Sequence, residues 1–293
     1  MNRRSHLSYL ALSALGLATL VPRNSWADSH SKKFQESLRQ LELRSQGRLG
    51  VHLLDTANGQ EFGHRSDERF MMLSSFKMLA SALVLARVDS GEESLDRRIR
   101  YRKEDLVSWS PVTEKFVGDE GMTLAQLCHA TITTSDNTAA NLILGSYGGP
   151  AALTAFARKI GDFTTRLDRI EPQLNTQSSA GPLDTTTPKA MAKTMQTLLL
   201  GNALSPSSRE VLKSWLIANT TGGKRLKAGI PTGWTIGDKT GTNRTDSNDI
   251  GILYPPVGAP LIVTAYLAES TASSQLKDEA LAEVARIITN MRS

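Results

Sequence analysis

The sequence predicts an α/β fold in which an antiparallel sheet, flanked by an N-terminal and a C-terminal helix, is interrupted by an inserted all-helical domain. Segments that alternate like strands stand near both ends of the 293-residue chain, whereas the long middle carries helical spacing. A chain of this length also exceeds the usual size of one compact core. We therefore expect an α/β domain of residues 28–68 and 213–293, a helical domain of residues 69–212, and a site between the two.

The elements of the α/β domain follow in order along the chain. Residues 31–46 have the spacing of a helix, residues 48–55 alternate as a strand, and residues 60–64 are expected to form its hairpin partner. Three later segments are also expected to be strands: residues 234–239, 248–254 and 261–268. An amphipathic helix at residues 274–291 ends the chain.

The first 27 residues are expected to be a cleavable export signal. Arg3 and Arg4 precede an apolar run, residues 7–21, and Ala27 ends a cleavage site of small residues. The paired arginines resemble a twin-arginine signal, and general secretion is the alternative route. An apolar run of about 15 residues is shorter than the roughly 20 needed to span a bilayer. We expect a periplasmic or secreted protein that has no stable membrane insertion after signal removal.

Composition argues against several classes of function. The net charge falls from +5 to +2 once the three arginines of the signal are removed, and no basic cluster with interleaved aromatics remains. Nucleic-acid binding is therefore not expected. Cys128 is the only cysteine and stands in an apolar segment, which favours a small buried side chain. The scattered histidines lack metal-binding spacing, so we expect no metal. We also expect that the protein uses no cofactor and is a monomer.

Chemistry is indicated by four short motifs in a fixed order: Ser74-Ser75-Phe76-Lys77, Ser135-Asp136-Asn137, Glu171-Pro172-Gln173-Leu174-Asn175 and Lys239-Thr240-Gly241. Ser74 and Lys77 are three residues apart in an apolar segment, so on a helix they share one face and the amine can take up the hydroxyl proton. The helix N-terminus adds an N–H group where an oxyanion would form. Alone, this motif would more often be an N-cap with an outward lysine.

The other motifs also have simpler interpretations when each is taken alone. Residues 135–137 lie between two helical segments, where Ser-Asp-Asn is usually an N-cap cluster. Lys239-Thr240-Gly241 follows an alternating strand, where it would usually be a turn, although its glycine lets a ligand approach the strand edge. Glu171 stands in a segment, residues 166–187, that has no regular pattern, and loops of this length are usually functional.

Together, the four motifs resemble those of class A serine β-lactamases, from about residue 48 to the C-terminus. The resemblance implies that Ser74 attacks the lactam carbonyl and becomes acylated, that Ser135 protonates the leaving nitrogen, and that Glu171 activates the water that hydrolyses the ester. Whether Lys77 or Glu171 activates Ser74 is disputed for the family. The implied function is hydrolysis of penicillins and cephalosporins, which gives resistance to these antibiotics.

The same resemblance implies which residues bind the substrate. Asn137 would hold the side-chain amide, Asn175 the deacylating water, and Lys239 with Thr240 the substrate carboxylate. Thr242 would supply a second N–H to the oxyanion. The remaining substrate-binding residues implied are Gly241, Trp109 at the entrance, and Arg225 in place of an arginine that many members carry after the strand.

The resemblance also implies features of the loop that carries Glu171. Asp184 would pair with Arg169 across the neck of the loop, and the peptide bond before Pro172 would be cis. Two alternative functions stay open, a D-alanyl-D-alanine peptidase and a β-lactam sensor domain. Glu171 and Asn175 disfavour the peptidase, because penicillin-binding transpeptidases lack such a base and stay acylated. A sensor would also stop at the acylated serine, and it would usually be tethered to a membrane segment.

Overall fold

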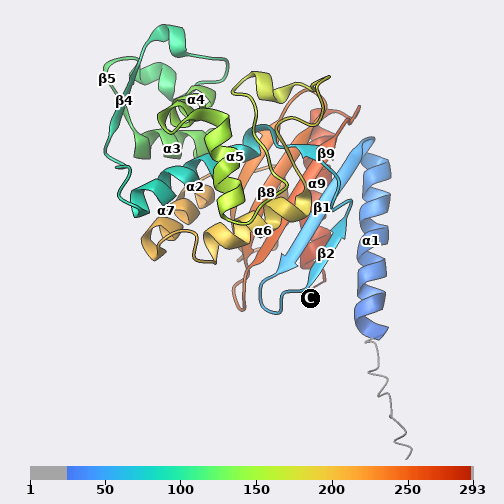
Figure 1. Cartoon of the computed structure of the whole chain (residues 1–293). Coiled ribbons are helices and arrows are strands. Elements are labelled where there is room, and N and C mark those ends of the chain that lie inside the picture. Colours follow the sequence, from blue (N-terminus) through green and yellow to red (C-terminus); the bar gives the residue numbers. More distant parts are fainter. Residues whose placement is uncertain (1–24, 292–293) are drawn as a thin grey trace, which may run out of the picture.

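The computed structural model describes residues 25–291, so the expected signal lies outside the described residues except for its last three. Five strands form one antiparallel sheet in the order β2-β1-β9-β8-β7 (Figure 1). Their bounds are β1 Arg48–Asp55, β2 Glu61–His64, β7 Thr235–Thr242, β8 Ser247–Tyr254 and β9 Leu261–Ala268. The antiparallel sheet and all five strands were predicted from the sequence, and β1 and β9 have the predicted ends.

Alternation along the strands divides the apolar residues between two cores. Leu49, Val51 and Leu53 of β1 belong to the core under the terminal helices, whereas Leu54 belongs to the core on the opposite face of the sheet. All eight residues of β9 are buried, because this central strand is covered on both faces.

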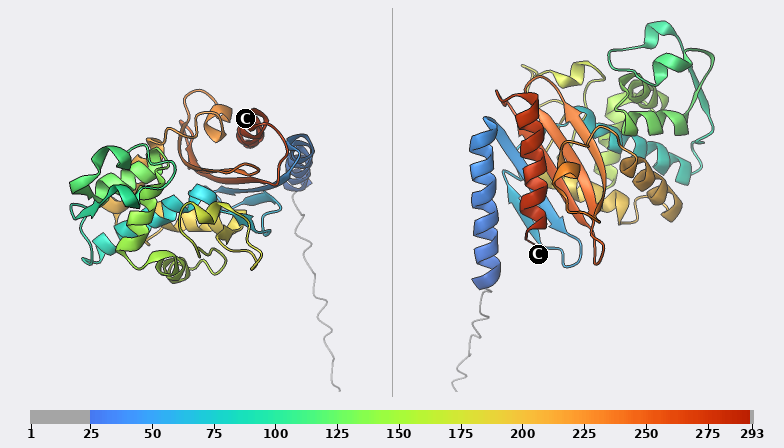
Figure 2. Two further views of the ribbon diagram at one scale, coloured as in Figure 1. Left: turned by 90° about the horizontal axis from the view of Figure 1, so that it is seen from above. Right: turned by 180° about the vertical axis from the view of Figure 1, so that it is seen from behind.

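One face of the sheet is covered by the two ends of the chain. Helix α1 (Ser25–Ser45) and helix α9 (Ser274–Thr289) lie side by side there, next to the short α8 (Leu226–Gly229), as Figure 2 shows. Helix α9 begins where Ser273 Oγ accepts a hydrogen bond from Leu276 N at 3.3 Å. Within residues 25–291, no helix is both long and apolar enough to cross a membrane.

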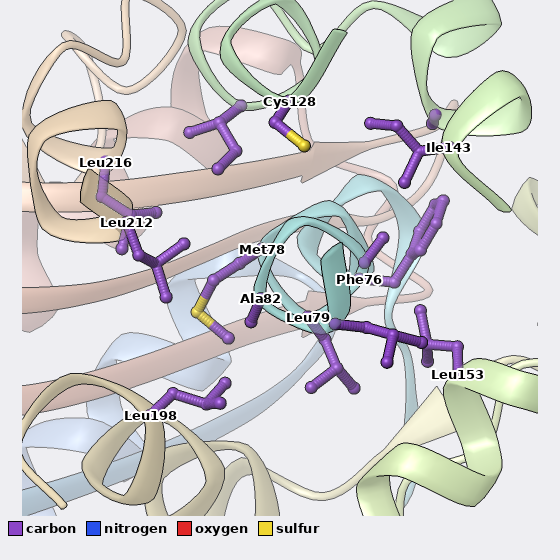
Figure 3. Packing of buried hydrophobic residues seen from close by; sticks show 14 of the residues in the cluster. Phe76, Met78, Leu79, Ala82, Cys128, Ile143, Leu153, Leu198, Leu212 and Leu216 are labelled. Carbon is purple, nitrogen blue, oxygen red and sulfur yellow. The ribbon is translucent and has the colours of Figure 1, made fainter. Parts of the chain in front are cut away.

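The opposite face carries the helical part of the chain, which is built around α2 (Phe76–Asp89). The surrounding helices are α3 (Leu124–Thr133), α4 (Asn137–Ser146), α5 (Gly149–Lys159), α6 (Pro188–Leu199) and α7 (Pro206–Ile217). Figure 3 shows Phe76, Met78 and Leu79 of α2 surrounded by side chains from each of these helices. A helix enclosed in this way is apolar nearly all round, which is the pattern that its sequence has.

Short elements complete the helical part. Strand β3 (Phe70–Met71) pairs with β6 (Thr185–Thr186), and β4 (Arg98–Tyr101) pairs with β5 (Gly118–Thr123). Four 3₁₀ turns occur in the described chain: η1 (Leu73–Ser75), η2 (Lys103–Asp105), η3 (Thr113–Phe116) and η4 (Gln173–Asn175). These short strands and turns were not predicted, since elements of two to six residues carry little or no periodic signal. The domain boundary expected at residues 212 and 213 falls inside α7, and the division into two domains stays a proposal.

Candidate active site

Ser74 lies in η1, the 3₁₀ turn before α2, and the helix itself begins two residues later, at Phe76. Leu73 before it has a φ of +48°, a conformation unusual for leucine. The turn is held against the sheet, because Asn248 Nδ2 of β8 donates to Met71 O at 2.8 Å and to Met72 O at 3.1 Å. The structure therefore fixes Ser74 at the point where the sheet meets the helical part.

Lys77 turns into this site and does not reach outward. Its side chain is 0% exposed, and Nζ lies 2.9 Å from Ser135 O, 2.5 Å from Asn137 Oδ1 and 3.1 Å from Glu171 Oε1. Burial lowers the pKa of Lys77, and the neighbouring Glu171 carboxylate opposes this shift. A lysine with a lowered pKa can exist as the neutral amine, which is the form that accepts a proton.

Ser135 stands between two buried amines. Its Oγ accepts hydrogen bonds from Lys239 Nζ at 3.1 Å and from Lys77 Nζ at 3.4 Å. Burial, and then the nearby Lys77, lower the pKa of Lys239 well below its usual value. Asp136 N-caps α4 through Ala139 N, and it also accepts hydrogen bonds from Val112 N and Thr113 N.

Glu171 faces Ser74 from the loop of residues 166–187. Its Oε1 accepts a hydrogen bond from Ser74 Oγ at 3.3 Å, and its Oε2 accepts one from Asn175 Nδ2 at 2.5 Å. Its backbone is held from α4, where Asn141 Oδ1 accepts from Glu171 N and Asn141 Nδ2 donates to Glu171 O, both at 2.9 Å. Asn141 was not predicted from the sequence, although an asparagine four residues after Asn137 shares its helix face.

The neck of this loop is closed by the predicted ion pair. Arg169 Nε lies 2.6 Å from Asp184 Oδ2, and Asp184 Oδ1 accepts from the backbone N–H groups of Asp168 and Arg169. Asp184 O also accepts from Met72 N at 2.9 Å, which ties the loop to the segment that leads into Ser74. The bond between Glu171 and Pro172 is cis, as the resemblance implied.

The end of β7 brings the Lys239-Thr240-Gly241 motif against the nucleophile. A side chain at Gly241 would place its Cβ 2.9 Å from Met72 O and 3.2 Å from Ser74 N, so glycine permits this close approach. Thr240 Oγ1 lies 2.5 Å from Thr221 Oγ1, and Thr242 at the end of the strand is exposed. The motif was placed correctly at the end of a strand, because the alternation continues through it.

Arg225 reaches the same strand end, but its guanidinium is largely occupied by the protein itself. Its nitrogens donate to Asp278 Oδ1, Gly241 O, Asn248 O and Thr242 Oγ1 at 2.7 to 3.0 Å, and the residue is 7% exposed. Four of its five N–H groups are used in these bonds, which leaves one for a ligand.

A buried acid pair, which the sequence did not reveal, lies behind Thr240. Asp238 of β7 and Asp249 of β8 are both buried, and each acid affects the pKa of the other. Burial raises the pKa of Asp238, and burial with the neighbouring Asp238 raises that of Asp249 well above its usual value. Asp238 Oδ2 accepts from Asn219 Nδ2 at 2.8 Å, and Asn219 Oδ1 accepts from Thr221, the partner of Thr240.

Two further predicted residues, Trp109 and Asn137, differ in their exposure. Trp109 is 66% exposed, and its indole Nε1 donates to Thr134 O at 3.0 Å. Asn137 is held by the protein on both sides of its amide, since Nδ2 donates to Ser108 O and Oδ1 accepts from Lys77. The structure thus brings all four motifs together around Ser74, with Trp109 and Arg225 at the edges of the group.

This arrangement can support acyl transfer followed by hydrolysis. A hydroxyl stands within reach of a buried carboxylate, which in turn contacts a buried amine whose pKa is lowered. Such groups can take the proton of an attacking hydroxyl and later that of a water molecule. The second hydroxyl, on Ser135, is linked to two amines that can exchange protons with it.

Comparisons with known proteins agree with this chemistry. The model of a beta-lactamase enzyme family matches residues 33–291. β-Lactamase OXY-2 of Klebsiella oxytoca is 46% identical over 282 residues, which are 96% of each chain. β-Lactamase L2 of Stenotrophomonas maltophilia is 49% identical over 249 residues, or 84% of this chain and 82% of that one.

Solved structures give the same result. An ancestral class A β-lactamase has a TM-score of 0.86 at 59% identity and covers 88% of this chain and 99% of its own. A putative class A β-lactamase of Rhodopseudomonas palustris has a TM-score of 0.86 at 56% identity, with the same coverage. The two sets of matches span nearly all of the described residues, including every motif of the site. The chain therefore belongs to the class A β-lactamases, the serine enzymes that hydrolyse β-lactams and confer resistance to them.

Proposed function

We propose that this β-lactamase hydrolyses penicillins and cephalosporins with Ser74 as nucleophile and Glu171 as the base of deacylation. The assignment is carried by one observation: the Ser74 hydroxyl and the Lys77 amine both contact the same carboxylate oxygen of Glu171. Glu171 Oε1 lies 3.3 Å from Ser74 Oγ and 3.1 Å from Lys77 Nζ. Each group that must give or receive a proton in acyl transfer is therefore within one hydrogen bond of the next.

In acylation, Lys77 or Glu171 takes the proton of Ser74, and Oγ bonds to the lactam carbonyl carbon. Backbone N–H groups of Ser74 and Thr242 stabilise the oxyanion. The ring C–N bond then breaks as the nitrogen receives the hydroxyl proton of Ser135. An ammonium group of Lys77 or Lys239 restores that proton, and the contacts of both amines with Ser135 Oγ support this relay.

In deacylation, Glu171 takes a proton from a water molecule, whose oxygen bonds to the ester carbonyl carbon. Ser74 Oγ leaves with the returned proton, and the opened acid is released. Asn175 orients the water with Glu171, a role supported by the 2.5 Å bond between Asn175 Nδ2 and Glu171 Oε2. A carboxylate so close to Ser74 argues against the peptidase and sensor alternatives, both of which stay acylated after they react with a β-lactam.

The substrate is bound around this centre. Lys239 and Thr240 bind its carboxylate, and the remaining N–H group of Arg225 assists them. We also propose that Asn137 binds the side-chain amide of the substrate. Gly241 lets the substrate approach the edge of β7 closely, and Trp109 lies at the entrance. The exposed position of Trp109 and the open end of β7 at Thr242 support this arrangement.

We also propose that the enzyme acts as an exported monomer. The basic start of the chain and its apolar segment up to residue 21 support export to the periplasm or medium, by the twin-arginine or the general route. The monomeric state is part of this proposal, since the groups named above all come from one chain and the proposed chemistry does not need a second.

Separation of acylation from deacylation tests the assignment. Ser74→Ala should form no adduct, whereas Glu171→Asn should form an ester that persists, because only its hydrolysis needs the base for water. Loss of a general base lowers turnover by about 10² to 10⁴-fold. Intact-protein mass spectrometry with benzylpenicillin should show one added ligand per chain, which digestion places on Ser74.

Two results would contradict the assignment. The first is near-normal turnover by Glu171→Asn, since the water would then be activated elsewhere. The second is an adduct on Ser135 or on another serine. Release of D-alanine from a D-alanyl-D-alanine peptide by the wild-type protein, with stable acylation by penicillin, would favour the peptidase instead.

A further inference from the structure

Asn243 links the two sides of the active site. It is the first residue after β7, and its Nδ2 donates to Asn175 O at 3.0 Å, across to the loop that carries Glu171. Its Oδ1 faces the other way and accepts from Thr245 N at 2.9 Å and from Asp246 N at 2.7 Å. Both halves of the amide are therefore used, one to form the turn between β7 and β8 and one to hold the loop.

Asn175 depends on this bond for its connection to the sheet. Its other hydrogen bonds within the described residues are made inside its own loop, to Pro172 O and to Glu171 Oε2. The neighbouring Leu174 packs in the core, but the local hydrogen bonds of this 3₁₀ turn do not connect Asn175 to the sheet. Asn243 is thus the side chain outside the loop that fixes the backbone of Asn175.

The side chain of Asn175 is where this constraint matters. Its Nδ2 donates to Glu171 Oε2 at 2.5 Å, while its Oδ1 is buried and has no donor among the described residues. A buried acceptor without a partner is costly unless a ligand or water satisfies it. A water that donates to Asn175 Oδ1 would lie beside Glu171, which is the place where the attacking water is needed.

We propose that Asn243 is a positioning residue for deacylation, acting through Asn175 on the water and on Glu171. This inference rests on the role proposed above for Glu171. Asn243 does not touch the reacting atoms. It holds Asn175 so that one half of the amide fixes the carboxylate and the other half stays free for water. Acylation does not use that water, so Asn243 affects the two half-reactions unequally.

Asn243→Asp isolates the bond to the loop. Aspartate keeps the oxygen that accepts from Thr245 N and Asp246 N, but it cannot donate to Asn175 O. Asn243→Ala removes both interactions. A matched control is Asn58→Asp in the turn between β1 and β2, because Asn58 Oδ1 accepts from the N–H two residues ahead, that of Gln60, at 2.8 Å.

Pre-steady-state and single-turnover kinetics with a chromogenic cephalosporin measure the two steps separately. We expect Asn243→Asp and Asn243→Ala to slow deacylation by about three- to tenfold, the range for one net hydrogen bond, with acylation changed less than about twofold. Acyl-enzyme should accumulate in proportion, as seen by quenched-flow mass spectrometry. Asn58→Asp should match the wild type in both steps.

A double-mutant cycle tests the route through Asn175. In an Asn175→Ala background no amide remains to be positioned, so adding Asn243→Asp should slow deacylation little further. Additive losses would overturn the proposed route. Equal losses in acylation and deacylation, or a loss in Asn243→Ala alone, would assign Asn243 only to the turn.

Failure of this inference is distinguishable from failure of the proposed function. If Glu171→Asn deacylates normally, the role of Glu171 is wrong and the effect proposed for Asn243 falls with it. If Glu171→Asn is slow while Asn243→Asp deacylates at the wild-type rate, the role of Glu171 stands and only the inference on Asn243 is overturned.

Discussion

Lys77 and Lys239 show how burial changes the chemistry of single residues. Both side chains are fully buried, and burial is the main cause that lowers the pKa of each. Two amines whose charged forms are disfavoured by burial both contact the Ser135 hydroxyl, so a proton can pass between them through this hydroxyl. A lysine in an apolar helix was the sequence signal for this site, and the structure supplies its physical reason.

Arg225 was expected to bind the substrate, but most of its guanidinium N–H groups are bonded to the protein itself. Because most of its N–H groups hold Gly241, Thr242, Asn248 and Asp278, Arg225→Ala should lower the free energy of unfolding by about 1–3 kcal/mol. It should also raise KM for penicillins more than it lowers kcat, since a cation near the substrate carboxylate is lost. Urea unfolding and steady-state kinetics measure the two effects.

Arg100→Ala is the matched control, because Arg100 is exposed on β4 and should leave both quantities unchanged. An Arg225→Ala variant with wild-type KM would remove Arg225 from the substrate site and leave it a purely structural residue. A variant with wild-type stability would instead contradict the internal role.

At the scale of elements, the contact between β7 and η1 sets the geometry of the nucleophile. Asn248 of β8 holds the turn through two hydrogen bonds, and Gly241 allows β7 to approach the same turn closely. Strand and turn come from segments that are far apart in the chain, so their fit depends on the whole fold. Gly241 belongs to a motif that the sequence revealed, but the need for glycine there follows only from this contact.

Gly241→Ala tests the contact between these two elements. The added Cβ would meet Leu73 Cβ and Met72 O, each at 2.9 Å, so β7 or η1 must move. Overpacking of this kind costs about 1–3 kcal/mol, and we expect a lower thermal midpoint together with slower acylation. Gly223→Ala is the control, since its Cβ would enter open space. Equal acylation rates in the two variants would contradict a tight contact at Gly241.

At the scale of the whole molecule, the site lies where the sheet and the helical part meet. The sheet edge supplies Lys239 and Thr242, whereas Ser74, Ser135 and Glu171 come from the segments between residues 69 and 212. The acid pair of Asp238 and Asp249 is buried under this junction and joins β7 to β8. The stability of the fold is therefore linked to a proton held close to the active site.

This linkage predicts how stability depends on pH. The pKa of Asp249 is raised in the folded protein, so the stability contributed by its protonated form is present at low pH and is lost as pH rises through the folded pKa. The amide that Asp249→Asn introduces has no such proton to lose. The free energy of unfolding of this variant, relative to the wild type, should therefore increase with rising pH.

Urea unfolding of the wild type, Asp249→Asn and Asp238→Asn over a series of pH values measures this trend. Both variants should show it, because the pKa of each acid is raised in the folded protein and an amide does not titrate. A relative stability that falls as pH rises would mean that the pair is ionised in the folded protein.

The sequence by itself determined the five strands of the main sheet, the helical character of the middle of the chain and the residues of the four motifs. Alternation is local, so β1 and β9 could be bounded from their own residues, and the spacing of Ser74 and Lys77 already placed them on one face. The ion pair of Arg169 with Asp184 was indicated by the resemblance that the four motifs carry.

Only the tertiary structure decided which distant groups support these residues. Asn141 on helix α4 and Asn243 at the end of the edge strand β7 hold the loop of Glu171. Asp249 on β8 lies near Asp238 on the neighbouring strand. No periodicity connects such residues, because each contact depends on how separate elements pack. Burial in the tertiary structure also decided the chemistry of Lys77. The enclosed position of this residue, and not its place in a motif, lowers its pKa.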